Sequence, residues 1–269
     1  MIYSIPLRTR GTECGPDRWV SLPAVIGYME HCRWQWMREP SLGLVEAVEE
    51  GHGFYVVNQS VALSRRFGQG VQGHVRCALR HAGRSVARGE QDVMRDDGVL
   101  LARCTIRGVW MSPSGRFARL PAAVRESVSD LPLAARRGEP EPGHPRSLFH
   151  PPQPLRSGLL NLAQGEEAPE LGHRHDMRVR ATDCDIFGHV NAANYVRFVA
   201  DSLALQGASP SLHRAELAYT GQARAGDRVV VHTGALGDER WAARILRGEE
   251  VLFSAVVETE AEAGSASRI

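Results

Sequence analysis

The chain has 269 residues, enough for two domains of ordinary size, and its formal net charge of +1 at pH 7 argues against nucleic-acid binding. No apolar run reaches membrane-spanning length and the first residues do not resemble a signal peptide, so we expect no membrane contact and a cytoplasmic location. The five cysteines are scattered and never form a C-x-x-C pair, which argues against a zinc site or disulfide framework.

The first half of the chain predicts one helix followed by consecutive strands. Residues 1–12 have the pattern of a strand and a turn, and a helix with Ser21 as N-cap begins next and ends before Pro40. This order predicts an antiparallel sheet wrapped around the helix, because alternating helices and strands are absent. The four strands expected after the helix are Tyr55–Leu63, Val71–Leu79, Arg84–Arg95 and Val99–Met111.

Residues 129–172 differ in composition, since they hold eight of the fifteen prolines. A long segment of this kind inside one compact domain is uncommon, so we interpret it as a linker between two domains. The expected domains are residues 1–128 and residues 173–269.

The second half repeats the order of the first. A strand up to Val179 enters a turn, and a helix follows with Asn191 as its N-cap. The repeated order indicates an internal duplication and an α+β fold. The four later strands are expected at Leu212–Tyr219, Asp227–Gly234, Arg240–Leu246 and Val251–Glu260.

The turn before the second helix carries the candidate chemistry. Asp185 and His189 lie just before the positive end of that helix, where unpaired amides can stabilise an oxyanion. Asp185 is expected to act as base or nucleophile, with His189 orienting water or donating to the carbonyl. The amides expected to bind the substrate or the oxyanion are those of Gly188, Val190, Asn191 and Ala192.

Structural roles compete with these chemical ones. Asp185 can be a capping carboxylate, and His189 can satisfy local backbone groups. Asn194 and Tyr195 suit a pocket or packing role better than a reactive one, and Asp183 is expected near the surface, supporting the turn. The histidines in and beside the proline-rich segment lack cysteine or carboxylate partners at ligand spacing, so we expect no metal and no cofactor.

Several segments together resemble the acyl-acyl-carrier-protein thioesterases of the plant and bacterial type. They are Glu13-Cys-Gly-Pro-Asp17-Arg18, the strand–turn–strand segment Val93–Arg103, Val109–Met111 with Arg119–Arg125, and the stretch Asp183–Asn191. The resemblance implies a double hotdog fold, in which two tandem domains, each a long helix wrapped by an antiparallel sheet, pair as a pseudo-dimer. It also implies catalytic roles for Asp185 and His189.

Two positions of that family's pattern are not matched. Phe187 stands where the family has Asn, and Ala223-Arg224 stands where it has Cys or Glu; Glu216 lies a few residues earlier. The local sequence Asp183-Cys-Asp185-Ile-Phe-Gly188-His189-Val190 is also similar to the D-x-D-x-x-G-[HIV]-V motif of single-domain hotdog acyl-CoA thioesterases, which again implies Asp185 as base or nucleophile.

The resemblance implies an acyl thioesterase that releases a fatty or polyketide acid from acyl carrier protein or coenzyme A. The first half lacks the Gly-His pair, so we expect it to have lost its site and to line an acyl pocket. The helix face with Ile26, Met29 and Trp36 either bounds that pocket or forms plain core. A monomer and a homodimer both fit. The alternatives are another hotdog enzyme, such as an enoyl-thioester hydratase, dehydratase or acyltransferase, and a non-catalytic acyl-thioester binder.

Overall fold

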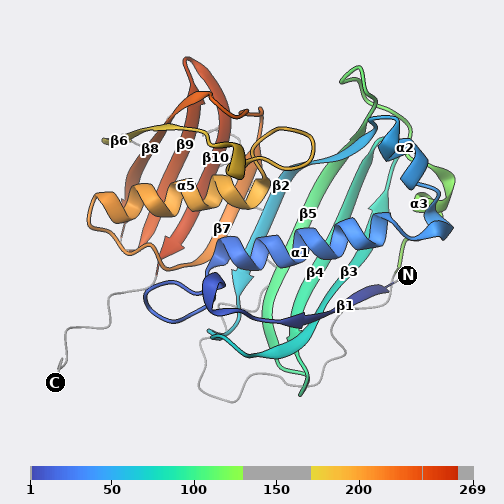
Figure 1. Ribbon diagram of the computed structural model, residues 1–269, viewed down its shortest axis with the longest axis horizontal. Coiled ribbons are helices and arrows are strands. Elements are labelled where there is room, and N and C mark those ends of the chain that lie inside the picture. Colours follow the sequence, from blue (N-terminus) through green and yellow to red (C-terminus); the bar gives the residue numbers. More distant parts are fainter. Residues whose placement is uncertain (1, 130–170, 238, 260–269) are drawn as a thin grey trace. The chain divides into compact units, whose positions relative to one another are not determined.

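The computed structural model describes residues 2–129, 171–237 and 239–259 (Figure 1). They form two compact units, and each is described by itself. The first unit holds the described residues up to Ser129, apart from the three residues 21–23, and the second holds those from Leu171 onward. Nearly all of the predicted linker lies outside the described residues. No helix among the described residues is long and apolar enough to cross a membrane.

The first unit contains a five-stranded antiparallel sheet in the order β1-β3-β4-β5-β2. The hairpin between β4 and β5 turns at Gly98, whose φ of +87° is readily adopted only by glycine. All four predicted strands of this half are confirmed within a few residues. With the first strand, the strands of this unit are β1 (Ile2–Arg8), β2 (Gly53–Leu63), β3 (Gln72–Ala82), β4 (Val86–Arg95) and β5 (Leu100–Met111).

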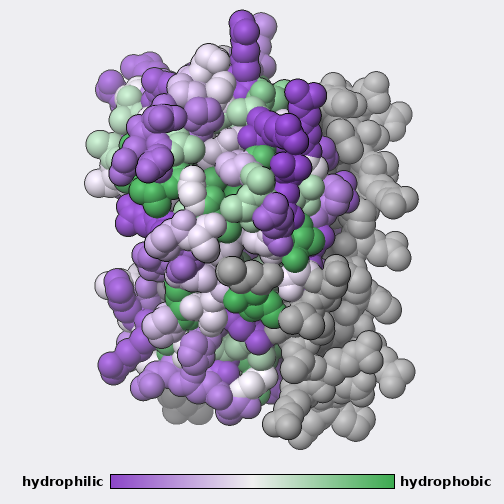
Figure 2. All heavy atoms as spheres, turned by 90° about the vertical axis from the view of Figure 1, so that its right-hand side faces the viewer, coloured by the Kyte–Doolittle hydropathy of each residue, from purple (hydrophilic) through white to green (hydrophobic). Residues whose placement is uncertain are grey.

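The long helix α1 (Leu22–Met37) lies across one face of this sheet and buries its apolar side there (Figure 1). Five residues of the predicted face are at most 1% exposed: Leu22, Val25, Ile26, Met29 and Cys32. Two short helices that the sequence did not indicate, α2 (Val45–Glu49) and α3 (Ala122–Glu126), belong to the same unit. Hydrophilic side chains dominate the face of the molecule shown in Figure 2, with small scattered hydrophobic patches.

The second unit repeats this arrangement with the sheet order β7-β10-β9-β8-β6, again antiparallel. Helix α5 (Ala192–Leu205) lies across it, and Val196, Val199 and Leu203 are fully buried at the helical spacing that the sequence predicted (Figure 1). The α+β class is thereby confirmed. The strands are β6 (His173–Arg178), β7 (Leu212–Tyr219), β8 (Arg228–Gly237), β9 (Arg240–Arg247) and β10 (Glu250–Thr259).

The duplication extends to the loop before each long helix. A short 3-10 turn, Gly11–Glu13, precedes α1, and its counterpart Ala181–Asp183 precedes α5. An isolated bridge closes each loop, joining Cys14 to Val20 in the first unit and Cys184 to Val190 in the second. Equivalent residues are therefore 170 positions apart, which allows the two loops to be compared residue by residue.

Candidate active site

A tight backbone loop brings Asp185 and His189 together between the 3-10 turn and α5. The Asp185 amide donates to the His189 carbonyl at 2.9 Å, and the Gly188 amide donates to the Asp185 carbonyl at 3.0 Å. Gly188 has a φ of +75°, a conformation that costs other residues free energy. The glycine thus permits the reversal that places the two side chains next to each other.

The two side chains form a carboxylate–imidazole pair. His189 Nδ1 lies 3.3 Å from Asp185 Oδ2, and the side chains are 15% and 16% exposed. The second carboxylate oxygen, Oδ1, accepts a hydrogen bond of 2.9 Å from the Phe187 amide, which fixes the orientation of the carboxylate. The Phe187 ring stacks on the imidazole with ring centroids 5.8 Å apart. The pair is therefore held in place and still partly accessible.

Three of the four amides expected to bind substrate are already engaged within the chain. The Gly188 amide donates to the Asp185 carbonyl at 3.0 Å. The Val190 amide donates to the Ala223 carbonyl at 2.8 Å, and the Asn191 amide donates to the Asp183 carbonyl at 3.0 Å. An amide that holds a backbone hydrogen bond cannot also stabilise an oxyanion without breaking it. To bind the substrate or an oxyanion, these three amides would have to release their backbone partners.

The fourth amide, that of Ala192, remains available. Among the described residues no hydrogen bond to it is found, as is usual for the first residue of a helix. Asn191 is confirmed as the N-cap, because its Oδ1 accepts from the Ala193 amide at 2.9 Å. The helix start therefore presents one amide, and the positive end of the helix dipole, for a developing negative charge.

The supporting residues predicted from the sequence have structural partners. Tyr195 is 3% exposed, its hydroxyl accepts from the Ala223 amide at 2.9 Å, and its ring stacks on Phe253. Burial raises the pKa of Tyr195 to about 12. Glu216 is buried on β7, with its carboxylate 3.9 Å from Arg214.

The sequence predicted Asp183 near the surface, and this prediction is wrong, because the residue is only 1% exposed. Its carboxylate is compensated by Arg180 and by Arg197 of α5, and its backbone carbonyl accepts from Asn194 Nδ2 at 2.9 Å. Sequence reasoning did not include Arg197. The available signal was its position three residues after Asn194, which places both side chains on one face of the helix.

The segment Ala223-Arg224, where the acyl-acyl-carrier-protein thioesterases that the sequence resembles have Cys or Glu, lies beside the turn. An isolated bridge joins His189 to Arg224, and the Ala223 carbonyl accepts from the Val190 amide. Its side chains are an alanine and an exposed arginine, so that part of the family's pattern has no counterpart of the same type here.

The equivalent turn of the first unit has no such pair. Gly15 and Trp19 stand at the positions of Asp185 and His189. Arg18 takes the position of Gly188 and keeps the left-handed conformation with a φ of +69°. The backbone of the turn is thus retained in the first unit while its two titratable side chains are replaced.

The first unit instead contains an apolar cavity. It lies between the last turns of α1, the sheet and α3, and its lining includes Trp36, Phe54, Ile106 and Trp110. Of the three residues expected around an acyl pocket, Trp36 lines this cavity, whereas Ile26 and Met29 are fully buried in the core. No group of three potential metal-ligating side chains occurs within the described part of the chain.

The arrangement of each unit, a long helix across an antiparallel sheet, is that of hotdog-like proteins. Solved structures share the fold over nearly the whole chain. An acyl-ACP thioesterase from Bacteroides thetaiotaomicron is 13% identical, with a TM-score of 0.73, over 96% of this chain and 98% of its own. The 12:0-ACP thioesterase from Umbellularia californica is 18% identical, with a TM-score of 0.70, over 96% of both chains.

The family model of the acyl-ACP thioesterase C-terminal domain matches residues 166–262, the range that contains the Asp185–His189 pair. No curated protein sequence matches the chain. The class of protein is therefore a thioester hydrolase.

Proposed function

We propose that this protein hydrolyses an acyl thioester carried on acyl carrier protein or coenzyme A and releases the free acid. The observation that supports this most is the Asp185–His189 pair, 3.3 Å apart, in the loop that leads to the available amide of Ala192 at the start of α5. Thioester hydrolysis needs an activated nucleophile and a donor aimed at the carbonyl oxygen as it becomes negative, and these groups supply both.

In the proposed mechanism the thioester carbonyl accepts a hydrogen bond from the Ala192 amide. Asp185 either takes a proton from an attacking water or attacks the carbonyl itself, and each route gives a tetrahedral intermediate. Collapse of this intermediate breaks the carbon–sulfur bond, and the thiolate leaves and takes up a proton. The first route gives the free acid directly, whereas in the second route water then hydrolyses the resulting anhydride. His189 orients the water or donates to the carbonyl, with its Nδ1 directed at the carboxylate.

We propose further that the two units are tandem hotdog domains, residues 1–128 and 173–269, joined by a linker and pairing as a pseudo-dimer with one site. The turn of the first unit supports a single site, because Gly15 and Trp19 replace the reactive pair. The apolar cavity of the first unit supports a role in holding the acyl chain, since its lining is almost wholly hydrophobic.

Carrier protein is the carrier that we favour, because the matching domain family is named for acyl-ACP. The test is a panel of acyl-carrier and acyl-coenzyme A thioesters, fatty and polyketide, assayed for thiol release and for the product. Free acid and free thiol from at least one substrate support hydrolysis. An altered acyl group still bound to its carrier would instead indicate a hydratase, dehydratase or transferase, and binding without turnover would indicate a binding protein.

A further inference from the structure

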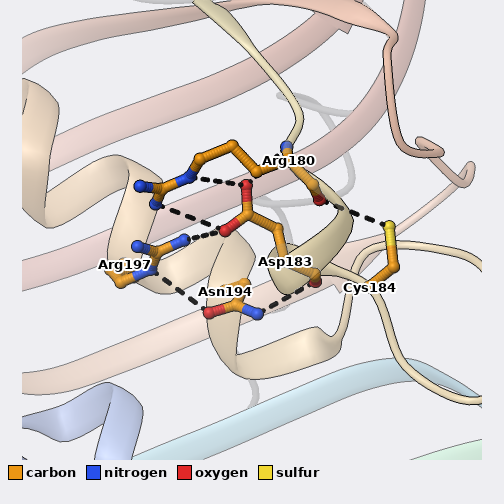
Figure 3. Close-up of polar contacts among 5 residues, drawn as sticks. All are labelled: Arg180, Asp183, Cys184, Asn194 and Arg197. Atoms are coloured by element: carbon orange, nitrogen blue, oxygen red, sulfur yellow. Dashed lines mark hydrogen bonds and ion pairs between the residues drawn. The ribbon is translucent and has the colours of Figure 1, made fainter.

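The buried carboxylate of Asp183 lies between two arginines (Figure 3). Arg197 Nη2 donates to Oδ1 at 2.5 Å, and the Arg180 side chain approaches both oxygens at 3.4 Å. The Arg180 amide adds a bond of 2.8 Å to Oδ2. Charge-assisted bonds of this kind are the stronger hydrogen bonds of proteins.

These contacts close a ring that joins the turn to the helix. Arg197 Nε donates to Asn194 Oδ1 at 3.2 Å, and Asn194 Nδ2 donates to the Asp183 carbonyl at 2.9 Å (Figure 3). The ring of Asp183, Asn194 and Arg197 therefore fixes the first residue of the loop to the first two turns of α5. All groups of the proposed site, Asp185, His189 and the Ala192 amide, lie on the segment between its ends.

An ionised carboxylate at 1% exposure is costly unless it is paired. Burial by itself would raise the pKa of Asp183, but the hydrogen bonds from Arg180 and the charge of Arg197 outweigh it and lower the pKa. The carboxylate is thus held charged and in one orientation, and so is the loop end to which it belongs.

In the first unit, the equivalent loop forms without this ring. Glu13 replaces Asp183, and its Oε2 accepts from the Arg10 amide at 2.6 Å and from the Tyr28 hydroxyl at 2.5 Å. Gly27 and Ala24 stand at the positions of Arg197 and Asn194, so neither side chain of the ring is present. The backbone turn forms all the same. Of the two units, only the one with the carboxylate–imidazole pair contains the ring. The ring therefore occurs together with that pair and is not required for the turn to form.

We propose that Asp183 and Arg197 are positioning residues, which hold Asp185 and His189 in register with the Ala192 amide. This inference rests on the proposed function. Mutation of a residue that orients a catalytic side chain typically lowers activity about 10–100-fold. Displacement of a catalytic group by near 1 Å can lower the rate about a hundredfold.

The experiment measures kcat and KM for thiol release, together with the thermal midpoint, in Asp183→Asn, Arg197→Met and the double variant. Glu13→Gln in the first unit is the matched control. We expect each single variant to lower kcat about 10–100-fold with KM changed less than about threefold, and the double variant to lose no more than Asp183→Asn alone. Glu13→Gln should lower the midpoint but leave kcat near that of the wild type.

If Asp183→Asn does not fold, Arg197→Lys tests the same positioning role. It retains the charge but cannot reach Asp183 and Asn194 with a planar fork, so we expect a near-normal midpoint and a reduced kcat. Folded variants that keep kcat within about twofold of the wild type would overturn the positioning role alone. A wild-type chain that releases no thiol from any substrate would refute the proposed function instead.

Discussion

His189 Nδ1 lies 3.3 Å from Asp185 Oδ2, across a loop whose reversal depends on the left-handed conformation of Gly188. The equivalent turn of the first unit has glycine and tryptophan at these two positions, so it cannot form such a pair.

The imidazole is expected to contribute through proton transfer or orientation of water. His189→Gln should lower kcat about 10²–10⁴-fold, the usual contribution of a positioned acid or base. His81→Gln changes an exposed histidine on β3 in the same way and should have no effect. A His189→Gln variant as active as this control would mean that the imidazole only supports the turn.

The Ala192 amide can be removed without removing the helix. Proline is tolerated at the first helical position, and Asn191 already has the extended ψ of 144° that a following proline requires. Ala192→Pro should therefore lower kcat about 10²–10³-fold with a thermal midpoint close to that of the wild type. Ala192→Ser retains the amide and should remain active. Equal activity of both variants would exclude this amide as the oxyanion donor.

Tyr195→Phe should destabilise the second unit by about 1–3 kcal/mol, because the buried Ala223 amide loses its acceptor. Burial raises the pKa of Tyr195 to about 12, so the neutral phenol favours the folded state. That contribution is complete below the ordinary pKa of tyrosine and is lost as the pH rises through about 12. Urea unfolding between neutral and alkaline pH should show a steeper loss of stability in the wild type than in Tyr195→Phe.

Asp183 has a lowered pKa in the folded protein. Its stabilising contribution is therefore present above the pKa of an unfolded aspartate, about 4, and is lost as the pH falls through the lower folded value. Asp183→Asn should be less stable than the wild type by about 1–3 kcal/mol at pH 7, and the difference should shrink in acid. A constant difference from pH 7 to pH 3 would show that the carboxylate is not the source.

The cavity of the first unit is expected to limit the length of the acyl chain. Ile106→Phe adds volume to its lining, so the preferred substrate should become shorter, at a cost in stability of about 1–3 kcal/mol. Ile5→Phe on β1 makes the same change outside this lining and should leave the preference unaltered. Acyl-chain profiles over the thioester panel distinguish the two; an unchanged profile in Ile106→Phe would exclude the cavity as the acyl site.

The sequence predicts elements whose pattern is local. The buried face of α5, the N-cap Asn191 and the hairpin at Gly98 follow from the spacing of apolar residues and from turn chemistry, and the structure confirms them. The five-residue helices α2 and α3 were missed because they are too short to show a helical period.

Contacts between distant residues account for the corrections at the site. The Val190 amide donates to Ala223, thirty-three residues further on, and this hydrogen bond has no local signal in the sequence. The burial of Asp183 depends on Arg197, which the sequence does not place against it. Spacing indicated which residues share the loop, but not which of their hydrogen-bonding groups remain available.

In the proposed function, Asp185 acts on the thioester. The most direct measurement is the rate of thiol release by Asp185→Asn from an acyl-carrier thioester that the wild type hydrolyses, with Asp17→Asn in the first unit as control. We expect a loss of about 10³-fold or more in Asp185→Asn and none in Asp17→Asn. Undiminished hydrolysis by a folded Asp185→Asn variant would contradict it.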